Sequence, residues 1–398
     1  MILVDTEEKF IELIENLDDN ILVYGDGTVA RQFVLQIREY YGTLDKVKMF
    51  CVSKMNQSMR MFDKPVVEYD ERNIQTDQTI VVALGRKARA EVEEVISESK
   101  GNVFIVDSAI MKSYGKEDLY YEDCIGNLKT FLEQSVYSVE ELIETKTVQN
   151  NKKLYAWTCW WQGEMQAPDL VRACINSQRK NMPKEVEHVV ITEKNYTDYI
   201  QFPDYIMRKV QDGNITLTTF SDMLREKLLY EYGGIWFDAT VLIHKSFPYD
   251  YFMLPLYTCK GKEHHFGSYS KWSLWCMGGV SGNVFFKLLY ELFFEYYKCN
   301  DKIKYYLTVD YFIKAALIYV DGAAILYDRI PINNENADNL AKHLKEEYSQ
   351  KLYNKLTQNT YLSKLTTKHF DGRNGKDFKG FSDTSIYEYI LGQYLDKR

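Results

Sequence analysis

The feature that most constrains the fold is a short apolar strand that is followed directly by a glycine-rich turn and a helix. Residues 21–24 form the expected strand, Gly25-Asp26-Gly27-Thr28-Val29-Ala30 forms the turn, and the helical pattern continues to Tyr40. Further strands are expected at 48–52, 79–84 and 102–106, with a helix at 86–99. Strands that alternate with helices in this way predict an α/β unit with a parallel sheet.

Gly25, Gly27 and Ala30 in this turn have two explanations. They let the backbone approach a pyrophosphate, or they form only the tight turn and close helix packing that such a fold needs. The second strand ends at Ser53 with no Asp or Glu placed to hold a ribose hydroxyl, which argues against NAD. The turn, together with residues 64–67, resembles small Rossmann-like domains fused to bacterial polysaccharide enzymes. We therefore predict a Rossmann-like domain over residues 1–112, with the turn as a candidate nucleotide site.

Length and composition define the broad class of protein. A chain of 398 residues is too long for one ordinary core and favours two domains. Its 45% of hydrophobic and 27% of charged residues are typical of a folded soluble protein. A net charge of -8 and a pI near 5.5 argue against nucleic-acid binding, which needs a basic surface.

Several features of the chain predict a cytoplasmic protein. Residues 1–10 carry acidic side chains where a secretory signal needs a basic and then an apolar segment. The apolar run at 284–297 is interrupted by three charges and is shorter than the roughly 20 residues that span a bilayer. The seven cysteines are widely spaced and form no Cys-x-x-Cys pair, which is typical of reduced thiols. The 32 tyrosines and 6 tryptophans suit either sugar stacking or an aromatic core, and they do not decide between these.

The second domain is expected to begin near residue 151, after a helical connector over residues 113–150. A strand at 154–157 leads into Trp160-Trp161-Gln162-Gly163. Open α/β sheets bind ligands at the carboxyl ends of their strands, so these four residues are candidates for substrate binding. Adjacent tryptophans are equally often anchors of a hydrophobic core.

Residues 221–240 carry the clearest chemical pattern. A helix is expected around Phe220, Gly233 and Gly234 end it, and the strand 235–237 places Asp238 at its end. Asp222 and Arg225 share one helix face, where they can bind sugar hydroxyls as acceptor and donor. The alternative is that Thr219 and Asp222 cap the start of the helix and that Arg225 is solvated or ion-paired.

These motifs resemble the capsular polysaccharide synthesis protein family, which is similar to the DxD glycosyltransferases of family 32. The resemblance covers residues 151–370. It implies a GT-A-like domain over residues 151–398, a nucleoside-diphosphate-sugar donor and retention of anomeric configuration. It also implies that Asp222 and Arg225 contact the donor sugar, that Trp161 contacts the base, and that Asp238 is the first aspartate of DxD. Ser221, Gly233, Gly234 and Thr240 belong to the same predicted substrate-binding segment.

One position departs from the DxD pattern. The second aspartate, which holds Mn²⁺ or Mg²⁺ in those enzymes, is replaced here by Thr240. A hydroxyl is a weaker metal ligand than a carboxylate, so metal affinity falls or cationic side chains replace the metal. A divalent cation stays a candidate cofactor, with Asp238 and, more weakly, His369 as its candidate ligands.

Three further residues are candidates for substrate binding. Asp310 follows Leu307-Thr308-Val309 on an aromatic helix, where it binds substrate or is a surface or cap residue. Lys364 and Lys368, near His369, are placed to meet a diphosphate, although a solvated basic run is the commoner explanation.

The sequence therefore predicts a hexosyltransferase that moves a sugar from a UDP-sugar, or another nucleotide sugar, onto a capsular or exopolysaccharide acceptor. A lipid-linked acceptor places the work at the inner face of the cytoplasmic membrane. The first alternative is a non-catalytic nucleotide-sugar-binding or assembly protein. The second, ranked last, is an NAD-dependent sugar oxidoreductase built on the turn at Gly25.

Overall fold

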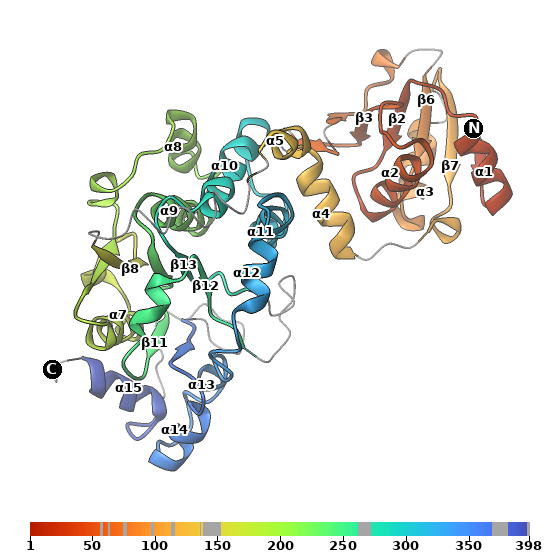
Figure 1. Cartoon of the computed structure of the whole chain (residues 1–398). Helices are drawn as coiled ribbons and strands as arrows, with labels where there is room; N and C mark the ends of the chain where they lie inside the picture. Colours follow the sequence, from red (N-terminus) through yellow and green to blue (C-terminus); the bar gives the residue numbers. More distant parts are fainter. Residues whose placement is uncertain are drawn as a thin grey trace. The chain divides into compact units, whose positions relative to one another are not determined.

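A computed structural model describes residues 1–55, 59–62, 64–74, 78–96, 99–112, 116–135, 137, 153–261, 272–367 and 381–395. The chain divides into two compact units. The first unit comprises Met1–Gln134 and Phe294–Phe312, and the second comprises Ser135–Phe293 and Ile313–Arg398. Each unit is described by itself below, with the element labels of Figure 1.

The first unit is a seven-stranded sheet flanked by helices. Its strand order is β1-β7-β6-β2-β3-β5-β4, and every neighbouring pair is parallel except β4 with β5. The strands are β1 (Ile2–Val4), β2 (Ile21–Tyr24), β3 (Val47–Val52), β4 (Met59–Met61), β5 (Lys64–Glu68), β6 (Thr79–Val82) and β7 (Asn102–Val106). The helices are α1 (Glu7–Glu15), α2 (Thr28–Tyr41), α3 (Arg86–Ile96), α4 (Lys116–Gly126) and α5 (Lys129–Gln134).

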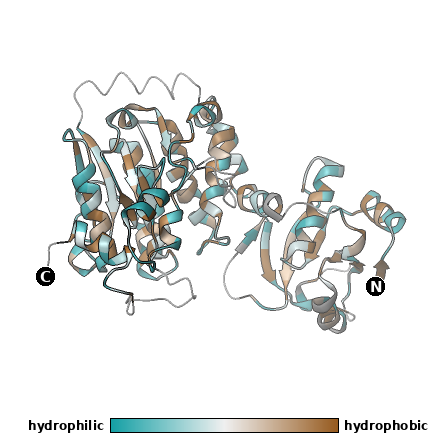
Figure 2. Ribbon diagram, turned by 90° about the horizontal axis from the view of Figure 1, so that it is seen from below, coloured by the Kyte–Doolittle hydropathy of each residue, from teal (hydrophilic) through white to brown (hydrophobic). Residues whose placement is uncertain are grey.

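The central strand β2 is buried on both faces. Ile21 and Val23 point into a core shared with α1 and α2, whereas Leu22 and Tyr24 point into a core shared with α3. Continuous apolar strands of this kind are typical of parallel sheets covered by helices on both sides. Figure 2 shows brown, hydrophobic segments along the sheet of this unit, in agreement with this burial.

The sequence placed the main elements of this unit correctly. The strands expected at 21–24, 48–52, 79–84 and 102–106 are β2, β3, β6 and β7, and the helix expected at 86–99 is α3. Strands β1, β4 and β5 were not expected; two of them have only three residues, too few for a clear alternation. Within the connector predicted at 113–150, the described residues form α4 and α5.

The second unit contains a five-stranded mixed sheet and a separate two-stranded one. The strands are β8 (Leu154–Cys159), β9 (Val186–Ile191), β10 (Gly234–Phe237), β11 (Val241–Ile243), β12 (Leu256–Thr258), β13 (Cys276–Gly279) and β14 (Leu362–Lys364). The helices are α7 (Asp169–Asn181), α8 (Asp204–Gln211), α9 (Leu217–Tyr232), α12 (Ala323–Arg329), α13 (Asn339–Lys342), α14 (Gln350–Leu356) and α15 (Ile386–Tyr394). Helices α10 (Val284–Cys299) and α11 (Thr308–Tyr319) have residues in both units.

The strand order of the larger sheet is β12-β13-β10-β8-β9. Strands β9, β8 and β10 are parallel, and β13 runs antiparallel to β10. From β8 the chain passes through α7 to β9 on one side, and it then returns through α8 and α9 to β10 on the other side of β8. The carboxyl ends of β8 and β10 therefore flank a point where the strand order reverses, which is where open α/β sheets bind ligands.

Apolar side chains of the second unit gather on both sides of β10. Ile235 and Phe237 lie in one core with Val241 and Phe252, whereas Trp236 between them points to the opposite face of the strand. Helices α7 and α15 lie beside each other near β11 (Figure 1), and apolar side chains of the three elements form a further cluster.

No helix among the described residues is long and apolar enough to cross a membrane. The seven cysteines carry free thiols, of which five are buried and Cys299 is exposed.

Gly233 and Gly234 connect α9 to β10 with backbone angles that side chains disfavour. Their φ angles are +69° and +96°. A Cβ on Gly233 would lie 2.5 Å from the Ser281 nitrogen, and a Cβ on Gly234 would overlap the carbonyl oxygen of Tyr155. The backbone that approaches these two glycines belongs to β8 and to the segment after β13. Glycine at both positions therefore lets β10 lie close to its neighbours in the sheet.

We predict that Gly234→Ala destabilises the protein by about 3 kcal/mol or prevents folding. The left-handed backbone costs about 1–2 kcal/mol and the overlap with Tyr155 about 1–3 kcal/mol. Gly213→Ala is the matched control, because Gly213 has a φ of +71° and open space around it. Urea unfolding measures both variants, and equal losses would contradict the packing role of Gly234.

Candidate functional site

Side chains from three segments meet at the carboxyl ends of β8 and β10. The pairing of β10 with β8 brings Asp238, which follows β10, close to Cys159 at the end of β8. Burial raises the pKa of the Cys159 thiol to about 12, and the negative charge of Asp238 also raises it. A hydrogen bond with Ser221 on α9 lowers the same pKa. Ser221 and Asp238 thus both lie near Cys159, and we call the region at the carboxyl end of β10 the β10 site.

Asp238 is held by two donors. Oδ1 accepts a hydrogen bond from the Trp236 indole (Nε1–Oδ1 2.9 Å), and Oδ2 is ion-paired with Lys364 (Nζ–Oδ2 2.5 Å). Burial acts to raise the pKa of the Asp238 carboxyl, but Lys364 and the hydrogen bonds outweigh it and lower that pKa below its usual value. The lowered pKa means that the Asp238 carboxylate is ionised at neutral pH. Its side chain is 33% exposed, so a ligand can reach it.

Lys364 comes from a part of the chain distant in sequence. Strand β14 pairs antiparallel with β11 and sets Lys364 opposite Val241, three residues after Asp238. The next amide, from Leu365, donates to the Thr240 carbonyl at 2.9 Å. The Lys364 ammonium also donates to the Thr240 hydroxyl (Nζ–Oγ1 2.9 Å). One lysine therefore links both ends of the Asp238-Ala239-Thr240 motif.

His244 supports the pairing of β11 with β14 from the following position of the chain. Its Nε2 lies 2.8 Å from Ser363 Oγ, and its Nδ1 lies 2.9 Å from the Tyr353 hydroxyl. Burial, with a smaller effect of Lys245, lowers the pKa of His244 to about 3. The imidazole is therefore neutral at physiological pH.

Helix α9 carries a buried charged cluster of Asp222, Arg225 and Glu226. Arg225 Nη1 lies 3.0 Å from Asp222 Oδ1, and Arg225 Nε lies 2.9 Å from Glu226 Oε1. The Arg225 guanidinium also lies 5.9 Å from the centre of the Trp236 ring. Only 2% of the Arg225 side chain is exposed, against 21% for Asp222. Asp222 is thus the accessible member of the cluster, and the buried Arg225 fixes its position through their ion pair.

Burial and neighbouring charges set the ionisation of this cluster. Burial acts to lower the pKa of Arg225, but Glu226, Asp222 and Asp238 raise it above its usual value. Burial raises the pKa of Glu226 to about 7 against the opposing charge of Arg225. Of the alternatives drawn from sequence, capping by Thr219 and Asp222 is wrong, because α9 begins at Leu217 with Thr216 as its cap. The ion-paired alternative for Arg225 is confirmed, whereas solvation is excluded by its burial.

The residues after β8 divide into core and surface positions. Trp160 packs against Ala167, Val171 and Ile175, and the half-buried Trp161 packs against Tyr196 and Phe220. Gln162 is exposed, and Gly163 has a φ of +90° with open space around it. The geometry gives both tryptophans a packing role, and base contact by Trp161 stays a prediction.

The remaining candidates lie in different parts of the chain. Asp310 is in the first turn of α11, is 9% exposed and belongs to the first unit, whereas Asp238 belongs to the second. Lys368 and His369 lie outside the residues that the structure describes. No group of three or more His, Cys, Asp or Glu side chains suited to a metal occurs within the described residues.

The glycine-rich turn of the first unit has a packing role at one position. A Cβ on Gly25, where φ is +125°, would lie 2.7 Å from the Ala83 carbonyl oxygen. Gly27 is the N-cap of α2 and has open space around it, and Ala30 is fully buried. The packing explanation therefore accounts for Gly25 and Ala30, and nucleotide binding at this turn stays a prediction.

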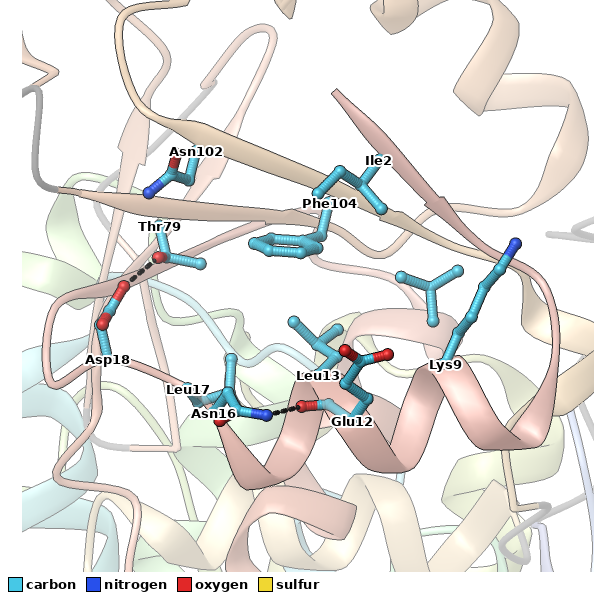
Figure 3. Close-up of a pocket in the computed structure, with 11 residues that line it drawn as sticks. Ile2, Lys9, Glu12, Leu13, Asn16, Leu17, Asp18, Thr79, Asn102 and Phe104 are labelled. Atoms are coloured by element: carbon cyan, nitrogen blue, oxygen red, sulfur yellow. Dashed lines mark hydrogen bonds between the residues drawn. The ribbon is translucent and has the colours of Figure 1, made fainter.

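A cavity of about 510 Å³ lies between α1 and the sheet edge formed by β1, β7 and β6 (Figure 3). Several of its polar side chains already have partners. Lys9 is ion-paired with Asp5 at 2.8 Å, Asp18 accepts from the Thr79 hydroxyl at 2.7 Å, and Asn16 donates to the Glu12 carbonyl at 2.8 Å. These groups face neighbouring residues, so the β10 site remains the better candidate for chemistry.

Sequence reasoning missed three residues that shape the β10 site. Glu226 pairs with Arg225, and the Trp236 indole fixes one Asp238 oxygen. Gln178 on α7 donates to the carbonyl oxygens of Asp238 and Val241 at 3.1 and 2.9 Å. A glutamate among apolar helix positions was the one available signal, because charged residues are rarely fully buried unless they are paired.

We predict that Arg225→Leu and Glu226→Leu each destabilise the protein by about 3–5 kcal/mol, because each leaves a buried partner uncompensated. The loss of unfolding free energy in the double variant should be smaller than the sum of the two single losses, by about 1 kcal/mol or more. Lys227→Ala, which breaks the more exposed Lys227–Glu231 pair (3.0 Å) on the same helix, is the control and should cost less than about 1 kcal/mol. Urea unfolding of all four variants measures this, and strict additivity would contradict a coupled pair.

We also predict that acidification weakens the β11–β14 pairing through His244. The unfolded chain takes up a proton below about pH 6.5, whereas folded His244 takes one up only near pH 3, so stability is lost as pH falls between these values. Between pH 7 and 5 the loss from this residue is on the order of 2 kcal/mol.

The variant His244→Gln lacks this proton uptake, so its unfolding free energy should depend less on pH than that of the wild type. Identical pH profiles for His244→Gln and the wild type would contradict a buried, neutral His244.

Comparisons with known proteins agree with the motif in the second unit. The family model described as capsular polysaccharide synthesis protein matches residues 122–382. Among solved structures, one described as PaToxG glycosyltransferase is 14% identical, covers 62% of this chain and 99% of its own, and has a TM-score of 0.29. That score is too low to support an argument about the fold. No curated protein matches.

The family match covers well over half of the chain and includes α9, the β10 site and β14. The chain therefore belongs to the capsular polysaccharide synthesis protein family.

Proposed function

We propose that this protein is a glycosyltransferase that moves a hexose from a nucleoside-diphosphate sugar, with a UDP-sugar favoured, onto a capsular or exopolysaccharide acceptor. Family membership supports a role in capsule synthesis. The single observation that carries the proposal is the position of Asp238, an ionised and partly exposed carboxylate at the carboxyl end of β10, where the strand order reverses.

The residues of the β10 site suit a sugar donor. Carboxylates of Asp222 and Asp238 accept hydrogen bonds from sugar hydroxyls, and charge-assisted bonds of this kind are about twice as strong as neutral ones. Arg225 is too buried to contact the donor directly, so we assign it a positioning role beneath Asp222 and Trp236. A negative charge near the anomeric carbon also stabilises the oxocarbenium-like transition state of glycosyl transfer.

We also propose a fold family for each of the two units. The second unit is GT-A-like and similar to the DxD enzymes of family 32, and the first is Rossmann-like. The parallel order β1-β7-β6-β2-β3-β5 supports the latter assignment. The acceptor is a saccharide or lipid-linked saccharide, reached at the inner face of the membrane, and the product retains the anomeric configuration of the donor.

The proposal is tested by incubating the protein with a panel of UDP- and GDP-sugars and measuring release of the nucleoside diphosphate. We predict slow donor hydrolysis by the wild type. Asp238→Asn should lower the rate by about 100-fold or more, because it removes a charge that acts in the transition state. Asp212→Asn, at the exposed end of α8, is the control and should keep the full rate.

Near-native turnover by Asp238→Asn would overturn the assignment of the site. Binding of a nucleotide sugar without turnover, with or without Mn²⁺, would favour the alternative of a non-catalytic binding or assembly protein. The ion pair that covers one oxygen of Asp238 is the observation that keeps this alternative open.

A further inference from the structure

The resemblance to DxD enzymes implies a divalent cation, and the residues of the β10 site do not fit one. Mn²⁺ and Mg²⁺ need several free oxygen ligands, most often carboxylates. Here the motif has one carboxylate, and its two oxygens already accept from Trp236 and from Lys364. The Thr240 hydroxyl oxygen, in the position of the second aspartate, also accepts from Lys364. A cation is therefore present between these two residues, and it is an ammonium.

The fold holds this ammonium in place. Lys364 is the last residue of β14, whose pairing with β11 sets it beside the Asp238-Ala239-Thr240 turn. Its own amide donates to the Ala337 carbonyl, and the next amide donates to the Thr240 carbonyl, each at 2.9 Å. Backbone bonds on both sides of the side chain fix the direction in which it leaves the strand. Such preorganisation lets a charge act on a transition state without reorganisation at the moment of reaction.

The ammonium also has capacity for a ligand. A lysine ammonium has three N–H donors, and two of them are used on Asp238 Oδ2 and Thr240 Oγ1. Its side chain is 25% exposed, so the third donor is available to a group that enters beside Asp238.

We propose that Lys364 takes the place of the divalent cation and binds the diphosphate of the sugar donor, so that transfer is independent of metal. This inference rests on the proposed function and names the residue that neutralises the leaving group. In the reaction, the bond from the anomeric carbon to the β-phosphate oxygen breaks, and its electron pair stays on that oxygen. The acceptor hydroxyl oxygen bonds to the anomeric carbon and its proton passes to the departing diphosphate, while Lys364 remains an ammonium throughout.

The first test uses the wild type alone, because it needs no substitution that affects folding. Protein treated with EDTA should bind UDP or GDP with the same Kd, measured by calorimetry, as protein supplied with Mn²⁺. Its melting temperature should not change when Mn²⁺ is added, and donor hydrolysis should continue in EDTA. Binding or hydrolysis that is lost in EDTA and restored by Mn²⁺ would overturn the role of Lys364 and leave the proposed function intact.

The second test removes the ammonium. Lys364→Met should weaken binding of the nucleoside diphosphate by about 10-fold or more, and it should not change the weak binding of the matching nucleoside, uridine or guanosine. Lys351→Met, on the exposed face of α14, is the matched control and should bind as the wild type does. Unchanged diphosphate affinity in folded Lys364→Met would overturn the inference.

The third test rebuilds a metal site in the same place. The double variant Thr240→Asp with Lys364→Met supplies a second carboxylate and removes the competing ammonium. Its binding of UDP or GDP should become dependent on Mn²⁺, with a rise in melting temperature when Mn²⁺ and the nucleotide are present together. If neither UDP nor GDP binds the wild type and no sugar donor turns over under any metal condition, the proposed function itself fails.

Discussion

The ion pair between Lys364 and Asp238 is the interaction on which the candidate site depends. It joins two segments that are 126 residues apart in the chain and lies at the reversal point of the larger sheet. An exposed ion pair contributes little to stability, but this one is fixed by backbone hydrogen bonds of β11 and β14 and is only partly open to water. Its importance is therefore electrostatic: it keeps one negative and one positive charge at a strand end where a charged ligand can enter.

A second group of charged residues, the Asp222, Arg225 and Glu226 cluster of α9, is linked to this pair through Trp236. Arg225 is fully enclosed by Asp222, Glu226 and the ring of Trp236, and Trp236 in turn donates to Asp238. Helix α9 and strand β10 are thus coupled through polar contacts as well as through apolar packing. Gly233 and Gly234 make this possible, because the turn between α9 and β10 would not fit beside β8 and β13 with larger residues.

The position of Asp238 at a strand end could be predicted because it depends only on the residues next to it in the sequence. A helical pattern, a double glycine and three apolar residues define a helix, a turn and a strand end. Ser221, Asp222 and Arg225 share that segment. In the structure Ser221 contacts Cys159 and Asp222 contacts Arg225, and the charge of Asp238 acts on both Cys159 and Arg225. The direct role in sugar binding that was predicted for Arg225 does not suit its burial, which depends on the partners Glu226 and Trp236.

Other contacts could not be predicted from local patterns. Lys364 was a candidate for the diphosphate, but its pairing with Asp238 depends on the register of β11 with β14, two three-residue strands with no distinctive alternation. The role of Gln178 depends on the packing of α7 against β11, which is a tertiary contact. The roles of Asp310, Lys368 and the Gly25 turn remain predictions for the same reason, since each requires a ligand or a neighbour that spacing alone does not reveal.

The most direct test of the central claim is an experimental structure of the protein with a bound nucleoside diphosphate, grown without divalent metal. The account predicts that the diphosphate oxygens lie within hydrogen-bond distance of Lys364 Nζ, beside Asp238 and Thr240, with the nucleoside on the side of β8. A diphosphate bound at the Gly25 turn, or one that occupies the β10 site only with a divalent metal between it and Asp238, would contradict it.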